Sequence, residues 1–401
     1  MRDYGRGGTN GVSGREFFEV AGDVIGRSVN SARLPMRHSQ PSGEIAMPYT
    51  VIDLGQDLDP WRLNLNNDVL FQAPTEDTPG QVRLVSGEVI TLPSEVGYLY
   101  GVSDNGLVLG ALKTGGSGWC DLATGQIEPI ALAGQPAFFG QAINTQGDVA
   151  GWVGEQAFII NRATRAITLV PPSLPSPLAG STSTNVLLND INDLGQAVGV
   201  QQWFDGTNQL ELPVWFNNGV LAPIGEPDFQ ANGILITNDQ TMRVWYNGRE
   251  DDGQDYIFDA NTGALTAFDG FILDLRSGGR VLWTVDTGIG PTYLTTPYGT
   301  AAVIELFPPG SGYVSAYGRQ INEAGTIIGT AGKDDGTAHA FMLVPDRAPP
   351  HINLPIGGVL IPTIIIEETG GIVETLFGDA PGPPEVFHQG EGQGEDGEDE
   401  R

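Results

Sequence analysis

One short acidic segment, residues 250–255, has the residue types that could hold a metal ion. It reads EDDGQD and places Asp251, Asp252 and Asp255 around Gly253. Carboxylate oxygens are the ligands that calcium prefers, and glycine permits the sharp turn that gathers them. The segment lacks the alternating donors of an EF-hand loop, and a solvated Asp-Gly hairpin turn is the favoured interpretation. Calcium, held by these three aspartates, is the one candidate cofactor.

Nucleophilic catalysis has few residues to use. The chain contains four histidines and one cysteine, and only His339 and Cys120 fall within its repetitive part. A Ser-His-Asp or Cys-His arrangement cannot be assembled from these two residues. We expect His339 to be structural and Cys120 to be a small core residue, and the single cysteine excludes an internal disulfide. A hydrolase that uses two carboxylates stays open, because acidic residues are plentiful.

The charge of the chain restricts its partners. It has 19 Lys and Arg against 49 Asp and Glu, a net charge of −30. Within residues 47–345 the count is 11 basic against 32 acidic residues, so the excess is not confined to the tail. Such a surface repels phosphate backbones, which argues against nucleic acid as a partner and favours basic or cationic ones. The apolar stretch 352–366 contains two prolines and is too short for a membrane span, and the first residues lack the apolar region of a secretory signal.

A turn motif recurs seven times along the chain. Aligned on one position, the copies are spaced 39, 41, 48, 46, 38 and 46 residues apart, at Asn64, Ser103, Asn144, Asn192, Asn238, Arg276 and Asn322. Asn can close a turn onto its own backbone, and a glycine three residues later can adopt a positive φ. Asn67 can replace that glycine in the first copy, whereas Thr241 in the fifth copy predicts a different turn.

Each recurrent turn joins two predicted strands, and a second strand pair with its own turn follows. Four short antiparallel strands in a unit of about 43 residues are typical of a propeller blade. The seventh unit lacks its last strand, and residues 49–55 (YTVIDLG) match the missing one. The sequence therefore predicts an all-β fold, a seven-bladed β-propeller of four-stranded blades whose ring is closed by the N-terminal strand, which leaves no open sheet edge.

The flanks of the predicted ring differ from it in composition. Residues 1–46 are rich in Gly, Ser and Arg and lack periodicity, so they form a disordered arm or lie upstream of a natural start at Met47. The propeller occupies residues 47–345. Residues 346–378 are a C-terminal extension with a predicted hairpin at 357–378, and 379–401 are an acidic tail that cannot bury apolar area.

The repeated phrases resemble those of a known family. YTVIDLG at 49–55, the INxxGxxxG turns and HAF at 339–341 resemble the bacterial HAF-repeat proteins, which are described as probable extracellular repeat proteins. The resemblance covers residues 48–345 and is strongest in units two, three, four and seven. It implies an extracellular or cell-surface location, but this chain shows no signal peptide. The family has no established common activity.

The strand alternation predicts two unlike rims. The A–B and C–D turns are tight and share one rim, which we call the turn rim. The opposite, loop rim carries B–C and D–A connections, the longest predicted at 201–212, 247–255, 285–290, 331–338, 171–184 and 225–231. Loops on a rigid scaffold are where binding residues concentrate. The predicted ligand contacts are Trp203, Phe204, Asp205, Phe229, Tyr246 and Tyr313.

Three functions compete on these grounds. The leading one is a non-enzymatic binding or scaffold propeller whose loop rim recognises a glycan, a peptide or a protein, with Trp203 as the anchor and dispensable for stability. Packing between blades is the ordinary alternative for such aromatic residues. The second function is a carboxylate-based hydrolase or lyase at the mouth of the central channel, and the third is a surface-layer component. On the turn rim, Asp193→Lys is expected to change neither binding nor stability. The sequence does not fix the oligomeric state.

Overall fold

The computed structural model describes residues 48–72, 78–131, 137–177, 180, 183–205, 207–247, 253–285 and 290–346. All of them belong to residues 44–401, the second of the two units into which the chain divides. The predicted N-terminal arm, the hairpin at 357–378 and the acidic tail lie outside the described residues.

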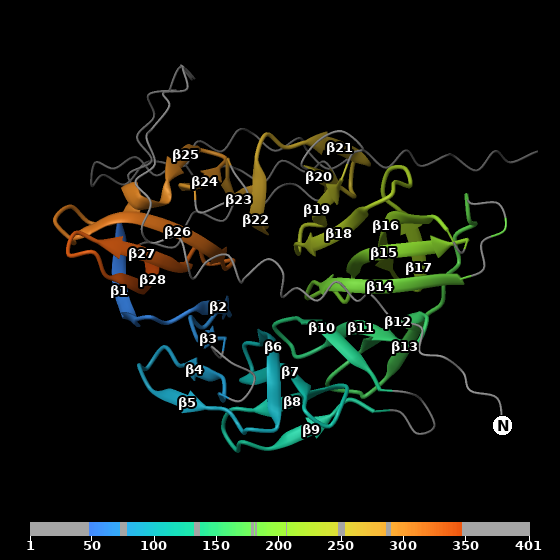
Figure 1. Ribbon diagram of the computed structural model, residues 1–401, viewed down its shortest axis with the longest axis horizontal. Coiled ribbons are helices and arrows are strands. Elements are labelled where there is room, and N and C mark those ends of the chain that lie inside the picture. The colour runs from blue at the N-terminus through green and yellow to red at the C-terminus, as the bar shows by residue number, and fades with distance from the viewer. Residues whose placement is uncertain are drawn as a thin grey trace, which may run out of the picture. The chain divides into compact units, whose positions relative to one another are not determined.

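Seven four-stranded antiparallel sheets surround a common centre (Figure 1). This arrangement confirms the predicted seven-bladed propeller. In blades 1 to 6 the first strand lies innermost and the other three follow outward in chain order, whereas in blade 7 the N-terminal strand is outermost. Blade 1 contains β2 (Pro60–Leu63), β3 (Val69–Phe71), β4 (Gln81–Arg83) and β5 (Val89–Thr91), and blade 2 contains β6 (Val96–Val102), β7 (Leu107–Leu112), β8 (Ser117–Asp121) and β9 (Ile127–Pro129). Blade 3 contains β10 (Phe139–Ile143), β11 (Val149–Val153), β12 (Gln156–Ile160) and β13 (Ile167–Val170). Blade 4 contains β14 (Ser183–Ile191), β15 (Ala197–Phe204), β16 (Gln209–Asn217) and β17 (Val220–Pro223).

The remaining blades complete the ring. Blade 5 contains β18 (Ala231–Ile236), β19 (Thr241–Tyr246), β20 (Gln254–Asp259) and β21 (Ala264–Ala267). Blade 6 contains β22 (Phe271–Arg276), β23 (Arg280–Thr284), β24 (Thr292–Thr296) and β25 (Gly299–Ala302). Blade 7 contains β26 (Tyr313–Ile321), β27 (Ile327–Lys333), β28 (Ala338–Pro345) and β1 (Tyr49–Gln56). A 3-10 turn, η1 (Val303–Leu306), follows β25. No helix in the described part of the chain is long and apolar enough to cross a membrane.

The N-terminal strand closes the ring as predicted. β1 pairs antiparallel with β28, from Tyr49 opposite Pro345 to Gln56 opposite His339, with one irregularity between Asp53 and Gly55. The outer edge of blade 7 is thereby supplied by the start of the propeller, so blade 7 has the same four strands as the others. Pairing two segments almost 300 residues apart in sequence joins the two ends of the ring.

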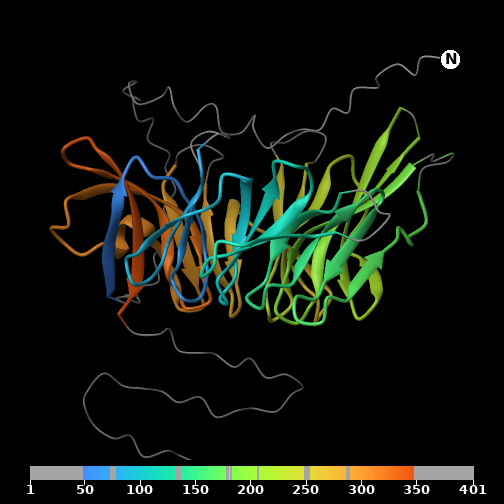
Figure 2. The same cartoon turned by 90° about the horizontal axis from the view of Figure 1, so that it is seen from below.

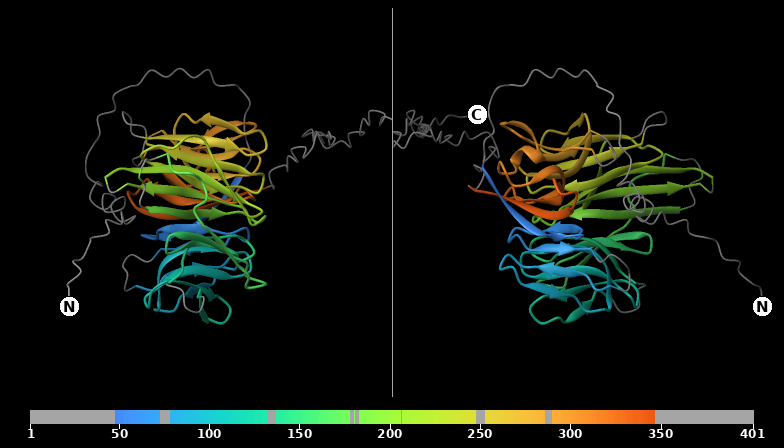
Figure 3. Two further views of the ribbon diagram at one scale, coloured as in Figure 1. Left: turned by 90° about the vertical axis from the view of Figure 1, so that its right-hand side faces the viewer. Right: turned by 60° about the vertical axis from the view of Figure 1, so that its left-hand side comes forward.

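The core lies between neighbouring blades, and a single strand serves two of these layers. In β7, Val108 packs in a cluster shared with blade 1, whereas the next residue, Leu109, packs in a cluster with Phe138 and Phe158 of blade 3. Successive side chains of a strand point to opposite faces, and both faces of an inner strand are covered by other blades (Figure 3). The second strand of a blade, such as β7, is therefore almost continuously buried, while outer strands such as β21 are exposed.

The final glycine of the repeated motif has a steric cause. A Cβ added to Gly151 or Gly199 would lie 2.0 or 1.9 Å from the carbonyl oxygen of Phe139 or Leu187 on the preceding strand. At both positions that preceding strand has a register shift, which brings its backbone close to the glycine. Only a residue without a side chain fits against such an irregularity.

Candidate functional sites on the two rims and in the central channel

On the turn rim, the recurrent asparagine joins adjacent blades. Asn144 accepts the backbone N–H of Asp148 at 2.9 Å through Oδ1 and closes its own turn. Its Nδ2 donates to the backbone carbonyl of Asn192 in the next blade, 3.1 Å away. Asn64, Asn192 and Asn322 make the same inter-blade bond to the carbonyls of Ser103, Thr237 and Asn64, at 3.0, 3.0 and 2.9 Å. The sequence interpretation gave this residue only its local turn.

The fifth turn lies one residue earlier than predicted. Thr237, not Asn238, makes the turn-closing backbone bond, to Thr241 at 2.9 Å. Gln240 occupies the place of the glycine with φ 66°. The weak motif in this copy caused the misalignment. In the first copy, Asn67 adopts φ 66°, which confirms that it replaces the glycine.

Asp193 is a linker between three blades, so the expectation that its reversal to Lys is neutral does not hold. Its Oδ1 accepts the backbone N–H of Thr145 in blade 3 at 3.0 Å. In the other direction its Oδ2 accepts Nδ2 of Asn238 in blade 5 at 2.8 Å. A lysine would replace these two acceptors by a donor that faces the backbone N–H and hydroxyl of Thr145 and the side-chain amide of Asn238.

The predicted long loop at 201–212 is mostly regular hairpin. β15 continues to Phe204 and β16 begins at Gln209, with Phe204 opposite Gln209. Seen from the side, the loops lie along one edge of the ring and the tight turns along the other, and the green strands of blade 4 project beyond the loop edge (Figure 2). The period-2 alternation of this segment was the signal for strands that the sequence interpretation missed.

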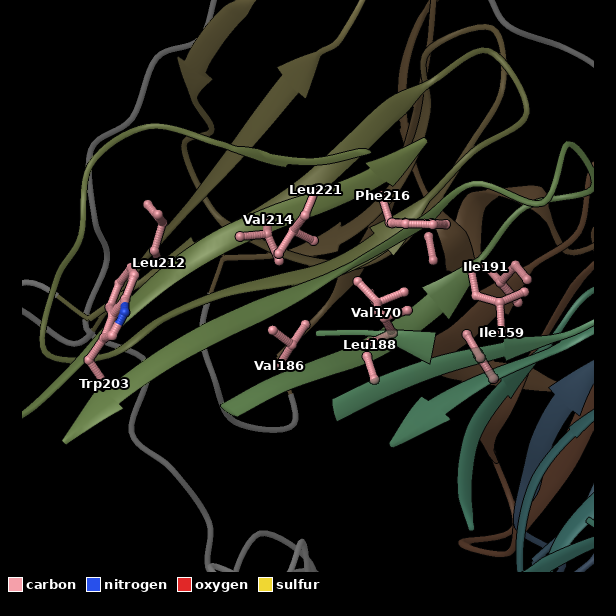
Figure 4. Packing of buried hydrophobic residues seen from close by; sticks show 14 residues of the cluster. Ile159, Val170, Val186, Leu188, Ile191, Trp203, Leu212, Val214, Phe216 and Leu221 are labelled. Carbon is pink, nitrogen blue, oxygen red and sulfur yellow. The ribbon is translucent and has the colours of Figure 1, made fainter. Parts of the chain in front are cut away.

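Trp203 is a core residue of that projection, contrary to its predicted place as an exposed anchor. Its side chain is 1% exposed and belongs to the apolar cluster of Leu212 and Val186. Figure 4 shows it beside Leu212, at the far end of the cluster from Ile191 and Ile159. It supports the hairpin from inside and is not accessible to a ligand.

The neighbours of Trp203 reach the surface. Phe204 is 42% exposed. Asp205 is exposed and closes the hairpin, because its Oδ1 accepts the backbone N–H groups of Thr207 and Asn208 at 2.8 and 2.7 Å. These bonds hold the pKa of Asp205 below its usual range. Asp205 is thus a turn residue beside an exposed aromatic ring.

Phe229 lies in the connection from blade 4 to blade 5, close to the same hairpin. Reciprocal backbone hydrogen bonds of 2.7 and 2.8 Å join Asp228 and Glu211 of β16. Phe229 follows directly and is 39% exposed. Two separate segments thus bring exposed phenylalanines to the projecting part of blade 4.

Tyr246 and Tyr313 are half-buried and contribute to packing. The Tyr246 hydroxyl donates to the backbone carbonyl of Ile224 at 2.8 Å, and its ring meets Tyr256 edge-to-face at 5.4 Å. Tyr313 packs against Phe307 with ring centroids 4.9 Å apart. Both side chains stand at the loop rim, as predicted, but each is held by the fold itself.

Of the predicted calcium ligands, Asp251 and Asp252 lie outside the described residues. Asp255 is buried in β20, with Oδ1 2.8 Å from Nε of Arg243 and Oδ2 3.1 Å from its Nη2. Oδ2 also accepts the backbone N–H of Ile272 in blade 6 at 2.7 Å. The carboxylate therefore joins two blades. Among the described residues, no three His, Cys, Asp or Glu side chains are grouped in a way that could hold a metal ion.

His339 and Cys120 have structural positions. His339 Nδ1 lies 3.0 Å from Oδ1 of Asp53 on the closing strand, and Lys333 donates to Oδ2 of the same carboxylate at 2.7 Å. Cys120 is buried in the core between blades 1 and 2, as predicted, and burial raises the pKa of its thiol to about 11. Neither residue is placed as a nucleophile or a general base.

The central channel is a polar cavity of about 580 Å³, for which the sequence interpretation named no lining residues. Four arginines and five acids line it, a near balance in a strongly acidic ring. These residues are Arg62, Arg243, Arg276, Arg319, Asp104, Asp190, Asp193, Asp274 and Glu323. Several stand two residues before the recurrent turn position, on the innermost strands. The turn alignment itself therefore contained the signal for this lining.

Two channel carboxylates hold the next blade. Asp190 accepts the backbone N–H of Ile236 at 2.9 Å, and Asp274 accepts that of Ile321 at 2.9 Å. Burial raises the pKa of Asp190 to about 6. Burial also raises the pKa of Asp274, against the opposing effect of Arg276, whose Nη2 lies 2.9 Å from its Oδ2. Both carboxylates combine a structural bond with a place in the channel lining.

Comparisons with known proteins extend to the fold alone. No protein-family model and no curated protein matches the chain. Similar solved structures include dipeptidyl peptidase 4 of Porphyromonas gingivalis, with 12% identity, a TM-score of 0.42, and coverage of 72% of this chain and 53% of that one. The β-propeller domain of the Trilobed protease from Pyrococcus furiosus has 8% identity, a TM-score of 0.45, and coverage of 72% and 95%. A chain of the Mitotic Checkpoint Complex has 14% identity, a TM-score of 0.45, and coverage of 79% and 100%. The chain spans about half the length of the first of these proteins.

Proposed function

We propose that this chain is a non-enzymatic binding propeller that recognises a glycan, a peptide or a protein through its loop rim. The carrying observation is the distribution of exposed aromatic rings. Of the five exposed aromatic side chains in the described residues, Tyr98, Phe139, Phe204 and Phe229 stand at or near the loop rim and only Tyr298 on the turn rim. Large aromatic side chains dominate binding hot spots.

The projecting part of blade 4 is the strongest element of this proposal. Its hairpin has an internal support in Trp203 and a closed turn at Asp205, and the Asp228–Glu211 bridge fixes the second segment. Phe204 and Phe229 are therefore presented on a structure that needs no ligand to order it. Pre-organised contacts lose less conformational entropy on binding.

The test is a glycan and peptide array probed with the full chain and two variants. We expect Phe204→Ala/Phe229→Ala to lose at least tenfold in affinity for whichever ligand the array identifies. Tyr298→Ala on the turn rim removes a comparable exposed ring and is expected to bind like the wild type. Loss of binding in Tyr298→Ala with full binding in the double variant would show that the wrong rim was chosen.

A second candidate function, a carboxylate-based hydrolase or lyase in the channel, draws support from Asp190. A pKa of about 6 suits a general acid near neutral pH. Against it, Asp190 and Asp274 each hold a backbone N–H of the next blade, which is a sufficient reason for their presence. Hydrolysis of an array-identified glycan that disappears in Asp190→Asn would favour the enzyme over the binding protein.

The motif resemblance to HAF-repeat proteins belongs to the same proposal. An extracellular or cell-surface binding propeller is consistent with that family's description and with the acidic surface. Fractionation of cells that express the untagged chain tests the location. Recovery of the protein only inside the cell would remove this part of the proposal.

A further inference from the structure

Two arginines meet over one aromatic ring at the wall of the central channel. The guanidinium carbon of Arg62 lies 4.7 Å from the Trp61 ring centroid, and that of Arg319 lies 4.5 Å from the same centroid. Arg62 and Trp61 belong to β2 and Arg319 belongs to β26, two innermost strands that are neighbours across the closure of the ring (Figure 1). Their like charges oppose each other.

Arg319 has a carboxylate partner, Asp59. Arg62 differs, because no carboxylate oxygen of a described residue lies close enough to its guanidinium nitrogens to form an ion pair. Its Nε donates to the backbone carbonyl of Tyr100 at 3.1 Å, and Nη1 makes a long contact of 3.4 Å with that of Trp61. Arg162, Arg243, Arg276 and Arg280 each pair with an acid. Among the four arginines that line the channel, Arg62 is therefore the one without an acid partner in the described residues.

A guanidinium without an acid partner in a partly desolvated place is unfavourable unless a bound ligand neutralises its charge. Burial lowers the pKa of Arg62, which reports the same cost. The channel acids do not neutralise it directly, because Asp274 is already paired with Arg276 and Asp190 accepts a backbone N–H. Buried charges are normally paired or bound to a ligand.

The residues around Arg62 indicate what kind of ligand would bind to it. Tyr98 and Tyr100 line the same wall, with ring centroids 5.3 Å apart. Gln141 lines the channel, and its side chain makes no hydrogen bond with any other described residue. A guanidinium can bind a carboxylate, aromatic faces can pack against a sugar ring, and a side-chain amide can hydrogen-bond to sugar hydroxyl groups. Together these groups suit a sugar that carries a carboxylate. A dianion such as phosphate fits less well, because five acids share the lining.

We propose that the central channel binds a small monoanionic sugar acid, a uronate, whose carboxylate accepts hydrogen bonds from the Arg62 guanidinium. Tyr98 and Tyr100 flank the sugar ring, and Gln141 hydrogen-bonds its hydroxyl groups. The cavity of about 580 Å³ is large enough for such a ligand. This site is separate from the phenylalanines of blade 4 and does not depend on the rim proposal.

The test is isothermal titration calorimetry of the full chain with glucuronate and galacturonate, and with glucose as the neutral counterpart. We expect at least one uronate to bind and glucose to bind at least tenfold more weakly, because it lacks the carboxylate. Binding of glucose with equal affinity, or of neither uronate at tens of millimolar, would overturn the proposal.

Variants locate the binding. Arg62→Gln should weaken uronate binding at least tenfold, and Arg62→Lys, which keeps the charge but loses the forked geometry, at least several-fold. Arg165→Gln removes the same charge from an arginine paired with Glu128 on the outside of blade 3 and should bind normally. Phe204→Ala should also bind normally, which separates this site from the rim. If Arg62→Gln does not fold, Arg62→Lys alone decides, and undiminished binding in it would contradict the assignment.

Discussion

The side-chain amide of Asn322 donates to the backbone carbonyl of Asn64 at 2.9 Å and joins the last blade to the first. Its Oδ1 meanwhile accepts the backbone N–H of Thr326 at 3.0 Å, so one buried side chain closes a turn and links two blades. Ser103 holds the same place in blade 2 and closes only its own turn, accepting the N–H of Leu107 at 3.1 Å.

Replacing Asn322 by the residue found in blade 2 tests this double role. Asn322→Ser should keep the turn and lose the inter-blade bond, which leaves the Asn64 carbonyl with only the longer 3.3 Å bond from the backbone N–H of Asn67. The loss should cost about 1–3 kcal/mol of unfolding free energy. Urea denaturation measures it. Asn217→Ser, at the end of β16 and away from the turn rim's inter-blade bonds, is the control and should stay within about 0.5 kcal/mol of wild type. Equal stability of the two variants would show that the inter-blade bond contributes nothing.

Trp203 and Phe204 are adjacent and should respond oppositely to truncation. Trp203→Ala removes a buried side chain and should cost about 3–5 kcal/mol through lost burial and a cavity. Phe204→Ala removes an exposed ring and should cost less than about 1 kcal/mol. Denaturant midpoints of both variants check the corrected position of Trp203, and similar small losses in both would contradict its burial.

Asp53 should make ring closure sensitive to acid. Its burial opposes ionisation, but hydrogen bonds from Lys333, His339 and the backbone of Gly55 outweigh this and hold its pKa well below the usual range. The stabilisation is therefore present above the unfolded pKa of about 4 and is lost as pH falls below it. We expect Asp53→Asn to melt below the wild type at pH 7 and the gap to close toward pH 2. A gap that is independent of pH would exclude an ionic contribution.

Ionised Asp190 should affect the stability of the fold in the opposite direction to Asp53. Burial raises its folded-state pKa to about 6, so keeping it ionised in the fold is unfavourable. Its destabilising effect is absent below the unfolded pKa of about 4, grows as pH rises from there to about 6, and is fully present above that pH. Asp190→Asn should therefore be more stable than wild type at pH 8, by about 1–3 kcal/mol, and similar to it at pH 4. Thermal unfolding across this range measures it, and a variant less stable at pH 8 would refute the prediction.

The fold was predictable because its signals are local. Turn residues at a regular spacing and two-residue alternation define each hairpin, and the match of residues 49–55 to the last strand of a blade predicts closure. The fifth turn was misplaced by one residue because Thr237 and Gln240 satisfy it without the usual Asn and Gly. Backbone geometry can be met by more residue types than a motif describes.

The site was less predictable because burial is decided by other strands. Residues 201–212 have the length and polarity of a loop, yet Gln201 and Trp203 are buried by the connection before blade 4 and by β16. The channel lining depends on which strand of each blade is innermost, and only the assembled ring brings Arg62 next to Arg319. Pairing of distant charges is not visible in sequence spacing.

The most direct test of the central claim, recognition at the loop rim, is hydrogen–deuterium exchange with the ligand that the array identifies. Protection is predicted in peptides that cover 201–212 and 225–231, which include Phe204 and Phe229. Peptides that cover the turns at 192–196 and 296–300 should exchange as in the unbound chain. Protection confined to those turns, with the two loop-rim segments unchanged, would contradict the proposal.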